Sequence, residues 1–258
     1  MFFVRKLGGV MLGVIGRIFH VLRSVGRAVG FGPRAAKVLV SGAVLVLAVL
    51  NGSASAQDRR QNAVGEFDFY VLSLSWSPSF CEAAAERGQN GKSQQIQCGG
   101  RPFSFVVHGL WPQYDRGFPN YCQRPSPRLD RNIVSSMLDL MPAPGLIFNE
   151  WDKHGTCSGL PARGYFETIR KARAAIRIPE DFLDLTEPKT IAPADIEQAF
   201  VKANPGLSNS AIAVTCDNRR LSEVRICMSK DLQFRACEEI DRRACRRDTV
   251  VMPPIRGG

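Results

Sequence analysis

The sequence predicts a single α+β domain with a mainly antiparallel sheet, flanked by helices and cross-linked by disulfides. Strand-like and helix-like segments are mixed without a regular βαβ rhythm and without an internal repeat, which favours α+β over a parallel α/β fold. The 258 residues, 45% of them hydrophobic, are enough for one core. All eight cysteines follow residue 56, which predicts disulfides in an oxidising compartment.

Residues 1–56 have the pattern of a secretory signal peptide with a long basic N-terminal region. They contain seven Lys and Arg but no Asp or Glu, then an apolar run over 38–50, and then Ala54-Ser55-Ala56 before Gln57. The alternative is an uncleaved membrane anchor, against which the length of the run argues, because thirteen apolar residues are few for a membrane span. The rest of the chain has 27 Lys and Arg against 24 Asp and Glu, so the total charge of +10 is not a signature of nucleic-acid binding.

The apolar patterns divide the remaining chain into a flexible start over 57–65, a domain over 66–250 and a frayed tail over 251–258. Alternating apolar and polar residues predict strands over 66–76, 101–108, 211–216 and 221–228. Apolar residues at three-and-four spacing predict helices over 127–141, 165–177 and 195–203. The polar, Gly- and Gln-rich residues 82–100 predict a surface loop.

Individual residues refine two of these elements. Ser126 is the expected N-cap of the helix over 127–141, whose apolar stripe is expected to face the core. In the strand over 101–108, alternation places His108 on the side of Val106 and opposite Val107, and Gly109 is expected to end the strand.

Two histidines stand out because the third, His20, lies in the segment expected to be removed. His108 is followed by Gly109, and His154 belongs to a short helix that also carries Glu150 and Lys153. At 3.6 residues per turn, positions i, i+3 and i+4 share one face, which brings a carboxylate, an ammonium and an imidazole together. The plain alternative for this helix is a solvated face with an ion pair.

Two imidazoles, an ammonium and a carboxylate favour acid-base chemistry on a phosphodiester. One imidazole can take a proton while the other gives one, and the ammonium stabilises the negative charge of the transition state. RNA carries a 2′-hydroxyl that can act as the nucleophile without a metal ion, whereas DNA has none.

The segments FVVHGLWP (105–112) and NEWDKHGTC (149–157) resemble the two active-site segments of the ribonuclease T2 family, and 69–81 resembles its opening strand. The resemblance covers about the whole mature chain. It implies a ribonuclease T2-like fold and a secreted endoribonuclease that acts on single-stranded RNA without a metal or other cofactor. It implies that His154 is the general base, that His108 is the general acid, and that Glu150 and Lys153 stabilise the five-coordinate phosphorus. The product is a 2′,3′-cyclic phosphate, hydrolysed more slowly to a 3′-phosphate.

The same resemblance implies four substrate-binding positions. Trp111 matches an aromatic residue that stacks on a base, with core packing as the alternative, and Phe118 could be its partner. Asn149 stands where many members have a third histidine, which predicts a weaker phosphate clamp. Gln113 stands where some members have an Asp that recognises a base, so no base preference is predicted.

The cysteines alone admit 105 pairings and show no CxxC spacing that would favour zinc. The resemblance implies Cys122 with Cys157, and nested pairs Cys216 with Cys245 and Cys227 with Cys237. Cys81 with Cys98 is the remaining pair.

We therefore expect a secreted or periplasmic monomer that binds single-stranded RNA, does not act on DNA and has no stable membrane association after signal cleavage. One alternative is a metal-dependent phosphodiesterase that uses His108 and His154 as ligands. Another is a catalytically inactive secreted binding protein on the same scaffold, against which the joint presence of His108, Glu150, Lys153 and His154 argues.

Overall fold

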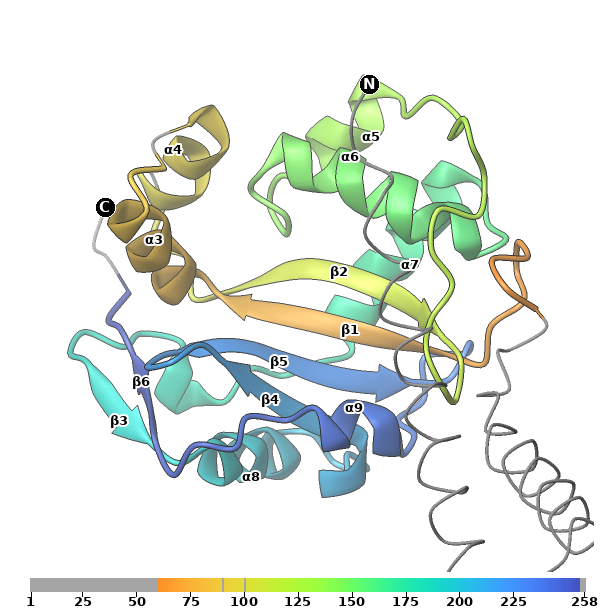
Figure 1. Cartoon of the computed structure of the whole chain (residues 1–258). Coiled ribbons are helices and arrows are strands. Elements are labelled where there is room, and N and C mark those ends of the chain that lie inside the picture. The colour runs from red at the N-terminus through yellow and green to blue at the C-terminus, as the bar shows by residue number, and fades with distance from the viewer. Residues whose placement is uncertain (1–59, 90, 100, 256–258) are drawn as a thin grey trace, which may run out of the picture. The chain divides into compact units, whose positions relative to one another are not determined.

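The fold is built around a four-stranded antiparallel sheet with the strand order β2-β1-β5-β4 (Figure 1). The computed structural model describes residues 60–89, 91–99 and 101–255, all within one compact unit. The predicted signal segment, 1–56, lies outside the described residues. The strands are β1 (Phe69–Trp76), β2 (Phe105–Gln113), β4 (Ile212–Cys216) and β5 (Leu221–Met228), and a second, two-stranded sheet pairs β3 (Lys189–Ile191) with β6 (Val250–Met252). The predicted α+β class and antiparallel sheet are confirmed.

Helices cover both edges of the sheet (Figure 1). They are α3 (Ser77–Glu86), α4 (Lys92–Cys98), α5 (Arg131–Ser136), α6 (Pro144–Lys153), α7 (Ala162–Ala174), α8 (Pro193–Ala203) and α9 (Glu238–Arg242), with 3₁₀ turns η1 (Gly155–Cys157), η2 (Glu180–Phe182) and η3 (Asn209–Ala211). Figure 1 shows α5 and α6 beside the edge strand β2, and α8 and α9 beside the opposite edge strand β4. Three helices begin with a proline in their first turn, where the missing N–H is not needed.

The two faces of the sheet have different environments. One face forms the main core with α5, α6, α7 and α8, and includes Leu72, Leu110 and Ile226. The other face forms a smaller cluster at one end, which includes Phe69, Val71 and Cys227. The remaining part of this second face carries polar side chains.

The strand β2 contains a β-bulge at His108. Ser73 of β1 is opposite Gly109, and the next residue, Leu74, is opposite Val107, so His108 is the extra residue. Without the bulge, His108 and Trp111 would point to opposite faces. With it, Val107 and Leu110 both face the main core, and Trp111 packs against the smaller cluster on the other face.

Several predicted boundaries are wrong. The strand continues past Gly109 to Gln113, and Pro112 is tolerated because β2 is an edge strand. Residues 82–100 contain the end of α3 and all of α4 rather than a loop, because Pro78 lies in the first turn of α3 and the alanines that follow propagate the helix.

The predicted helix over 127–141 is shorter than expected. It is limited to Arg131–Ser136, and its N-cap is Asp130, whose Oδ1 accepts from Asn132 N at 2.7 Å. Ser126 instead donates to Asp152 Oδ1 at 2.6 Å. The core role of the stripe is confirmed by buried Val134, Met137 and Met141.

The two ends of the domain are packed rather than loose. In the segment predicted as a flexible start, Gly65 N donates to Cys157 O at 3.0 Å and Asn62 Oδ1 accepts from Asn120 N at 2.8 Å. The predicted frayed tail is wrong for 251–255, because it includes part of β6, and Pro253 O accepts from the buried indole of Trp76 at 3.0 Å.

Candidate active site

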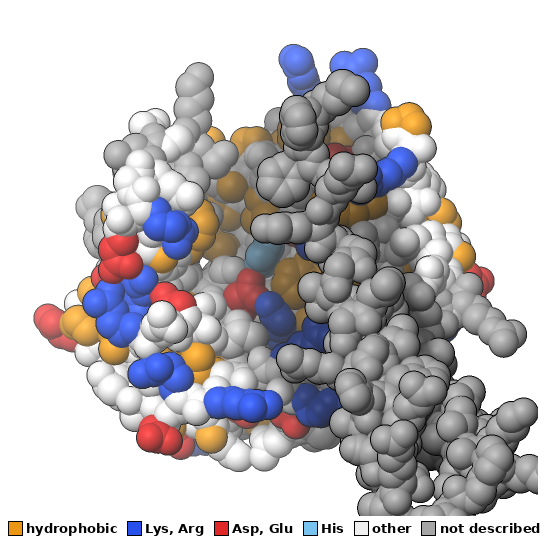
Figure 2. Space-filling view, viewed as in Figure 1, with side chains coloured by type: hydrophobic (Ala, Val, Ile, Leu, Met, Phe, Trp, Pro, Cys, Tyr) orange, Lys and Arg blue, Asp and Glu red, His pale blue; other side chains and the backbone are white. Residues whose placement is uncertain are grey.

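The bulge in β2 and the end of α6 bring the two predicted histidines into one site. His108 projects from the bulge, and His154 is the C-cap of α6, directly after Lys153. Trp111 contacts both imidazoles, with ring centroids 5.2 Å from His108 and 5.5 Å from His154. Figure 2 shows a histidine side chain on the floor of a hollow, with acidic and basic side chains beside it. The sequence-predicted central residues therefore lie together.

Each histidine is followed by a glycine that the packing requires. A Cβ added at Gly109 would overlap Glu150 Oε2 and Trp111 Nε1. These two atoms form a hydrogen bond of 2.7 Å that fixes both side chains. A Cβ at Gly155 would overlap the rings of Trp151 and Tyr165 in the core. The His-Gly pairs are thus required by close approach, and Gly109 in particular allows the carboxylate to enter the site.

His108 lies between two carboxylates. Its Nδ1 donates to Glu223 Oε1 from β5, and its Nε2 lies 3.7 Å from Glu150 Oε1 on α6. Burial lowers the pKa of His108, but the hydrogen bond to Glu223 and the charges of both carboxylates outweigh it and raise the pKa above 6.5. This environment stabilises the imidazolium relative to a free imidazole.

His154 has the opposite environment. Its side chain is buried, and burial together with the charges of Lys153 and His108 lowers its pKa to about 3. Its Nδ1 is buried without a hydrogen-bond partner among the described residues. At neutral pH this environment favours the neutral imidazole, which can accept a proton.

Glu150 is fully buried beside the two histidines. Burial raises its pKa to about 7, although His108, the Trp111 hydrogen bond and Lys153 each act to lower it. The site therefore holds a carboxyl group that is protonated in part near neutral pH. The Lys153 ammonium is half-buried and lies 6.0 Å from the ring of Phe118.

The predicted binding residues are not all equally close to the centre. Phe118 is 40% exposed and its ring lies 6.3 Å from that of His154, so it borders the site. Asn149 is exposed on α6, one residue before Glu150. Gln113 is buried, and its Nε2 donates to the backbone oxygen of Pro112 at 2.9 Å. Trp111 is half-buried, and its ring is covered by the Arg225 guanidinium at 5.1 Å.

All four predicted disulfides are present. They are Cys81–Cys98, Cys122–Cys157, Cys216–Cys245 and Cys227–Cys237. The second one joins the loop after β2 to the turn after α6, where Tyr121 N also donates to Lys153 O at 2.8 Å. This disulfide connects the two segments that carry the histidines.

The sequence analysis missed Glu223 and Arg225. They occupy alternate positions of β5, so they point to the same face of the sheet as Trp111 and bracket the bulge from the far side of β1. Two charged residues at alternate positions of an otherwise apolar strand were the available signal. No role could be assigned to them from the sequence, because the register that places them near His108 is not visible there.

In the described part of the chain, no group of three or more His, Cys, Asp or Glu side chains could hold a metal ion. Over the same residues, no helix combines the length and apolar character needed to cross a membrane.

Residues 67–237 of the chain match the model of the Ribonuclease T2 family. A "Probable ribonuclease" of Haemophilus influenzae is 32% identical over an alignment of 186 residues, covering 69% of this chain and 64% of that protein. A "Ribonuclease" of Aeromonas hydrophila is 39% identical over 119 residues, covering 46% of this chain and 51% of that protein. The chain thus spans less than two thirds of these two relatives. "Ribonuclease I" of Escherichia coli is 27% identical over 218 residues, covering 69% of this chain and 81% of that protein.

Solved structures share the fold at low sequence identity. An RNase-related protein from Calystegia sepium superimposes with a TM-score of 0.59 at 22% identity, over 74% of this chain and 99% of that one. RNase NT, solved in complex with 5′-AMP, gives a TM-score of 0.54 at 23% identity, over 73% of this chain and 99% of that one. These likenesses show the fold.

Proposed function

The chain belongs to the ribonuclease T2 family, and from this premise we propose that it is an endoribonuclease that cleaves single-stranded RNA by attack of the 2′-hydroxyl. The observation that carries the proposal is the contrast between the two imidazoles. His108 has a raised pKa and His154 a lowered one, within one site that both share with Trp111. Groups whose pKa values are separated in this way are suited to act as acid and base together.

In the first step, neutral His154 accepts the proton of the 2′-hydroxyl while its oxygen attacks phosphorus. His108 donates its Nε2 proton to the departing 5′-oxygen. The products are a 2′,3′-cyclic phosphate and a free 5′-hydroxyl. In the slower second step, His108 takes a proton from water while the water oxygen attacks phosphorus. The bond from phosphorus to the 2′-oxygen breaks, and His154 gives its proton to that oxygen, which leaves a 3′-phosphate and a free 2′-hydroxyl.

Two side chains of α6 stabilise the charge that develops on the non-bridging oxygens. Lys153 supplies a positive charge that is close enough to lower the pKa of both Glu150 and His154. Glu150, with its pKa of about 7, can donate a hydrogen bond to an oxygen in its protonated form. Bound phosphate also supplies the anion that the cationic form of His154 lacks.

The rim of the site offers aromatic faces to bases. Phe118 is exposed and Trp111 half-buried, so Phe118 is the more accessible of the two for stacking, which is worth about 1–3 kcal/mol per base. Asn149, exposed beside Glu150, can donate a hydrogen bond to a phosphate oxygen. Gln113 is buried, and we assign it no base preference. A requirement for the 2′-hydroxyl excludes DNA as a substrate.

The remaining expectations from the sequence stay proposals. Four disulfides support folding in an oxidising compartment, and hence secretion or a periplasmic location, after removal of residues 1–56. We also propose that the mature chain acts as a monomer and without a metal ion.

The direct test is cleavage of a short single-stranded RNA and its all-2′-deoxy counterpart in EDTA. We expect cyclic-phosphate ends from the RNA alone, and a loss of rate of about 10²–10⁴-fold in His108→Ala and in His154→Ala. A requirement for metal, or cleavage of the deoxy strand, would favour a metal-dependent phosphodiesterase. No cleavage by the oxidised wild type would favour a binding protein.

A further inference from the structure

Three neighbouring strands place an acidic and a basic side chain against the bulge in β2. In the register of β1 and β5, Glu223 is opposite Ser75 and Arg225 is opposite Ser73. The small serine side chains leave room above β1, so the long side chains of β5 can extend across it. Glu223 reaches His108, and the Arg225 guanidinium lies over the ring of Trp111 at 5.1 Å.

Both oxygens of Glu223 are engaged. Oε1 accepts from His108 Nδ1, and Oε2 accepts from Arg225 Nε at 2.9 Å and Nη2 at 2.7 Å. The carboxylate is buried, and desolvation alone would raise its pKa. The contacts with His108 and Arg225 outweigh desolvation and lower the pKa of Glu223 to about 2. Glu223 is therefore ionised at neutral pH and cannot rotate without breaking a charge-assisted hydrogen bond.

An ionised carboxylate only accepts hydrogen bonds, so Nδ1 of His108 must carry a hydrogen. The other nitrogen, Nε2, then has a proton in the imidazolium and a lone pair in the neutral ring. Nε2 is also the nitrogen that faces Glu150, at 3.7 Å. The contact with Glu223 thus leaves Nε2 as the nitrogen that can give or accept a proton, and it fixes the direction in which Nε2 points.

We propose that Glu223, itself held by Arg225, is a positioning residue that fixes the tautomer and orientation of His108. The mechanistic role rests on the proposed ribonuclease function. Glu223 serves both steps of that reaction. In the first, it favours the imidazolium that gives the Nε2 proton to the 5′-oxygen. In the second, it keeps the hydrogen on Nδ1, so that Nε2 is free to accept the proton of water.

The titratable and charged groups that face His108 come from two segments, β5 and α6 with its C-cap. From β5 they are Glu223, whose contact raises the pKa of His108, and Arg225, whose charge lowers it. From α6 they are Glu150, which raises it, and His154, which is neutral at physiological pH. Glu223 makes the only direct hydrogen bond to His108 among the described residues, so its removal should have the larger effect on this imidazole.

The test compares Glu223→Gln and Glu223→Asp with the wild type in the pH dependence of RNA cleavage. For Glu223→Gln we expect kcat to fall about 10–100-fold with KM little changed, because the substrate contacts remain. The basic limb of the kcat/KM profile should move to lower pH, because the imidazolium has lost its carboxylate. Glu223→Asp keeps the charge and should leave that limb nearer its wild-type position.

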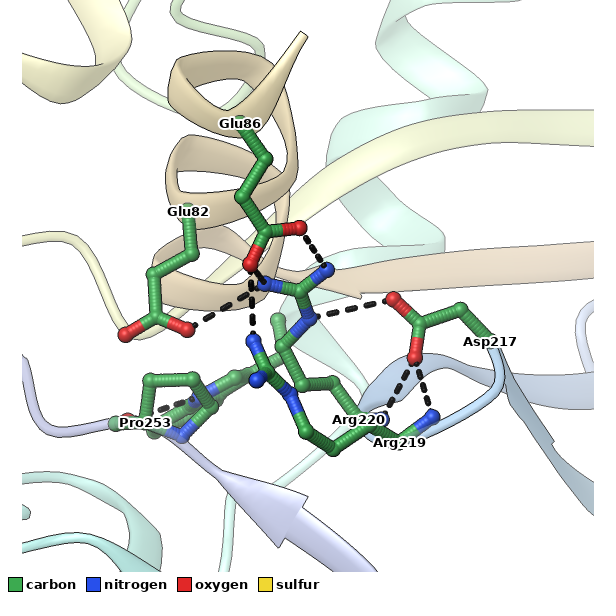
Figure 3. Close-up of polar contacts among 7 residues, drawn as sticks. Glu82, Glu86, Asp217, Arg219, Arg220 and Pro253 are labelled. Carbon is green, nitrogen blue, oxygen red and sulfur yellow. Dashed lines mark hydrogen bonds and ion pairs between the residues drawn. The ribbon is translucent and has the colours of Figure 1, made fainter.

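The matched control is Glu86→Gln, which removes another arginine-paired carboxylate, in a cluster on α3 away from the histidines (Figure 3). It should leave the pH profile unchanged. A fall in rate without a shift of the basic limb in Glu223→Gln would mean a structural role only and would overturn the proposal.

A second readout separates this proposal from the proposed function. The pKa of His108, followed by NMR in the oxidised chain, should be lower in Glu223→Gln than in the wild type, whether or not RNA is cleaved. An unchanged pKa of His108 would overturn the positioning role even in an active enzyme. If the wild type cleaves no RNA but this pKa shifts, the proposed function fails and the control of His108 by Glu223 stands.

Discussion

Two clusters of titratable side chains lie on the same sheet, and they differ in whether hydrogen bonds and ion pairs compensate for burial. Around Arg220, at the turn between β4 and β5, every partner favours the charged form (Figure 3). The buried guanidinium contacts Glu86 at 2.8 and 3.0 Å, Glu82 at 3.3 Å and Asp217 at 3.0 Å. Hydrogen bonds to Arg220 lower the pKa of Glu86, and hydrogen bonds to Arg220 and Arg219 outweigh desolvation and lower that of Asp217.

Around Glu150 and His154 in the active site, burial is only partly compensated. The pKa of Glu150 is raised to about 7 and that of His154 is lowered to about 3, so both are pushed toward their neutral forms. The two clusters therefore have different roles. The Arg220 cluster joins α3 to the β4–β5 turn, whereas the active-site cluster keeps Glu150 and His154 buried where their charged forms are disfavoured, as is typical of functional sites.

The largest change in stability is expected from substitution of Arg220. Arg220→Ala should lower the free energy of unfolding by about 3 kcal/mol, because it removes the buried guanidinium and the packing of its stem from the centre of an ion-pair network whose carboxylates are partly exposed. Urea unfolding measures this loss. Arg220→Met fills the same volume without a charge and should lose less. Both variants should cleave RNA at the wild-type rate at temperatures where they are folded. Loss of activity in the folded Arg220→Met chain would show that the Arg220 cluster also affects the active site.

The next effect is expected at Gly109. Gly109→Ala places a methyl group where Glu150 meets Trp111, so both side chains must shift. A displacement of about 1 Å costs about 100-fold in rate, which we expect in kcat/KM. Gly164→Ala on α7 is the control, because its added Cβ would meet neighbours at an ordinary 3.6 Å. Equal activities of the two variants would show that the Glu150–Trp111 contact is not needed.

The smallest effect is a gain in stability from neutralising Glu150. Its pKa is about 7 in the folded chain against 4.5 for the free group, so wild-type stability is lost as pH rises through this interval. Glu150→Gln removes that loss and should be more stable by about 1–3 kcal/mol above pH 7, while its activity falls. Urea unfolding at pH 5 and pH 8 measures the change.

Asp139→Asn is the control of opposite sign. The Asp139 carboxylate is paired with Arg170 at 2.7 and 2.9 Å, and this contact lowers its pKa. Its neutralisation should therefore decrease stability. If Glu150→Gln were also less stable than the wild type at pH 8, the view of Glu150 as an uncompensated buried carboxylate would be wrong.

The sequence predicted the parts of the site that depend on local geometry. Glu150, Lys153 and His154 follow helical spacing, and spacing alone places them on one face. The bulge at His108 could not be predicted in this way, because it is defined by the pairing of β2 with β1, which lie about 35 residues apart in the chain. Regular alternation in an isolated strand would put His108 and Trp111 on opposite faces.

Long-range contacts explain the other differences. Glu223 reaches His108 only because β1 presents serines at the two positions in between, and their register with β5 is a property of the sheet. The tail was expected to fray because it is rich in Pro and Gly. Instead, the Trp76 indole at the far end of β1 donates to Pro253 O and holds it. Composition gives no information about such partners.

The central claim is that one site holds its two imidazoles in opposite charge states, and NMR titration of the oxidised chain without RNA tests it directly. His108→Ala and His154→Ala assign the two signals. We expect His108 to titrate above pH 6.5 and His154 to remain neutral far below it. Titration of both imidazoles near pH 6.5, or in the reverse order, would contradict the claim and the acid and base roles derived from it.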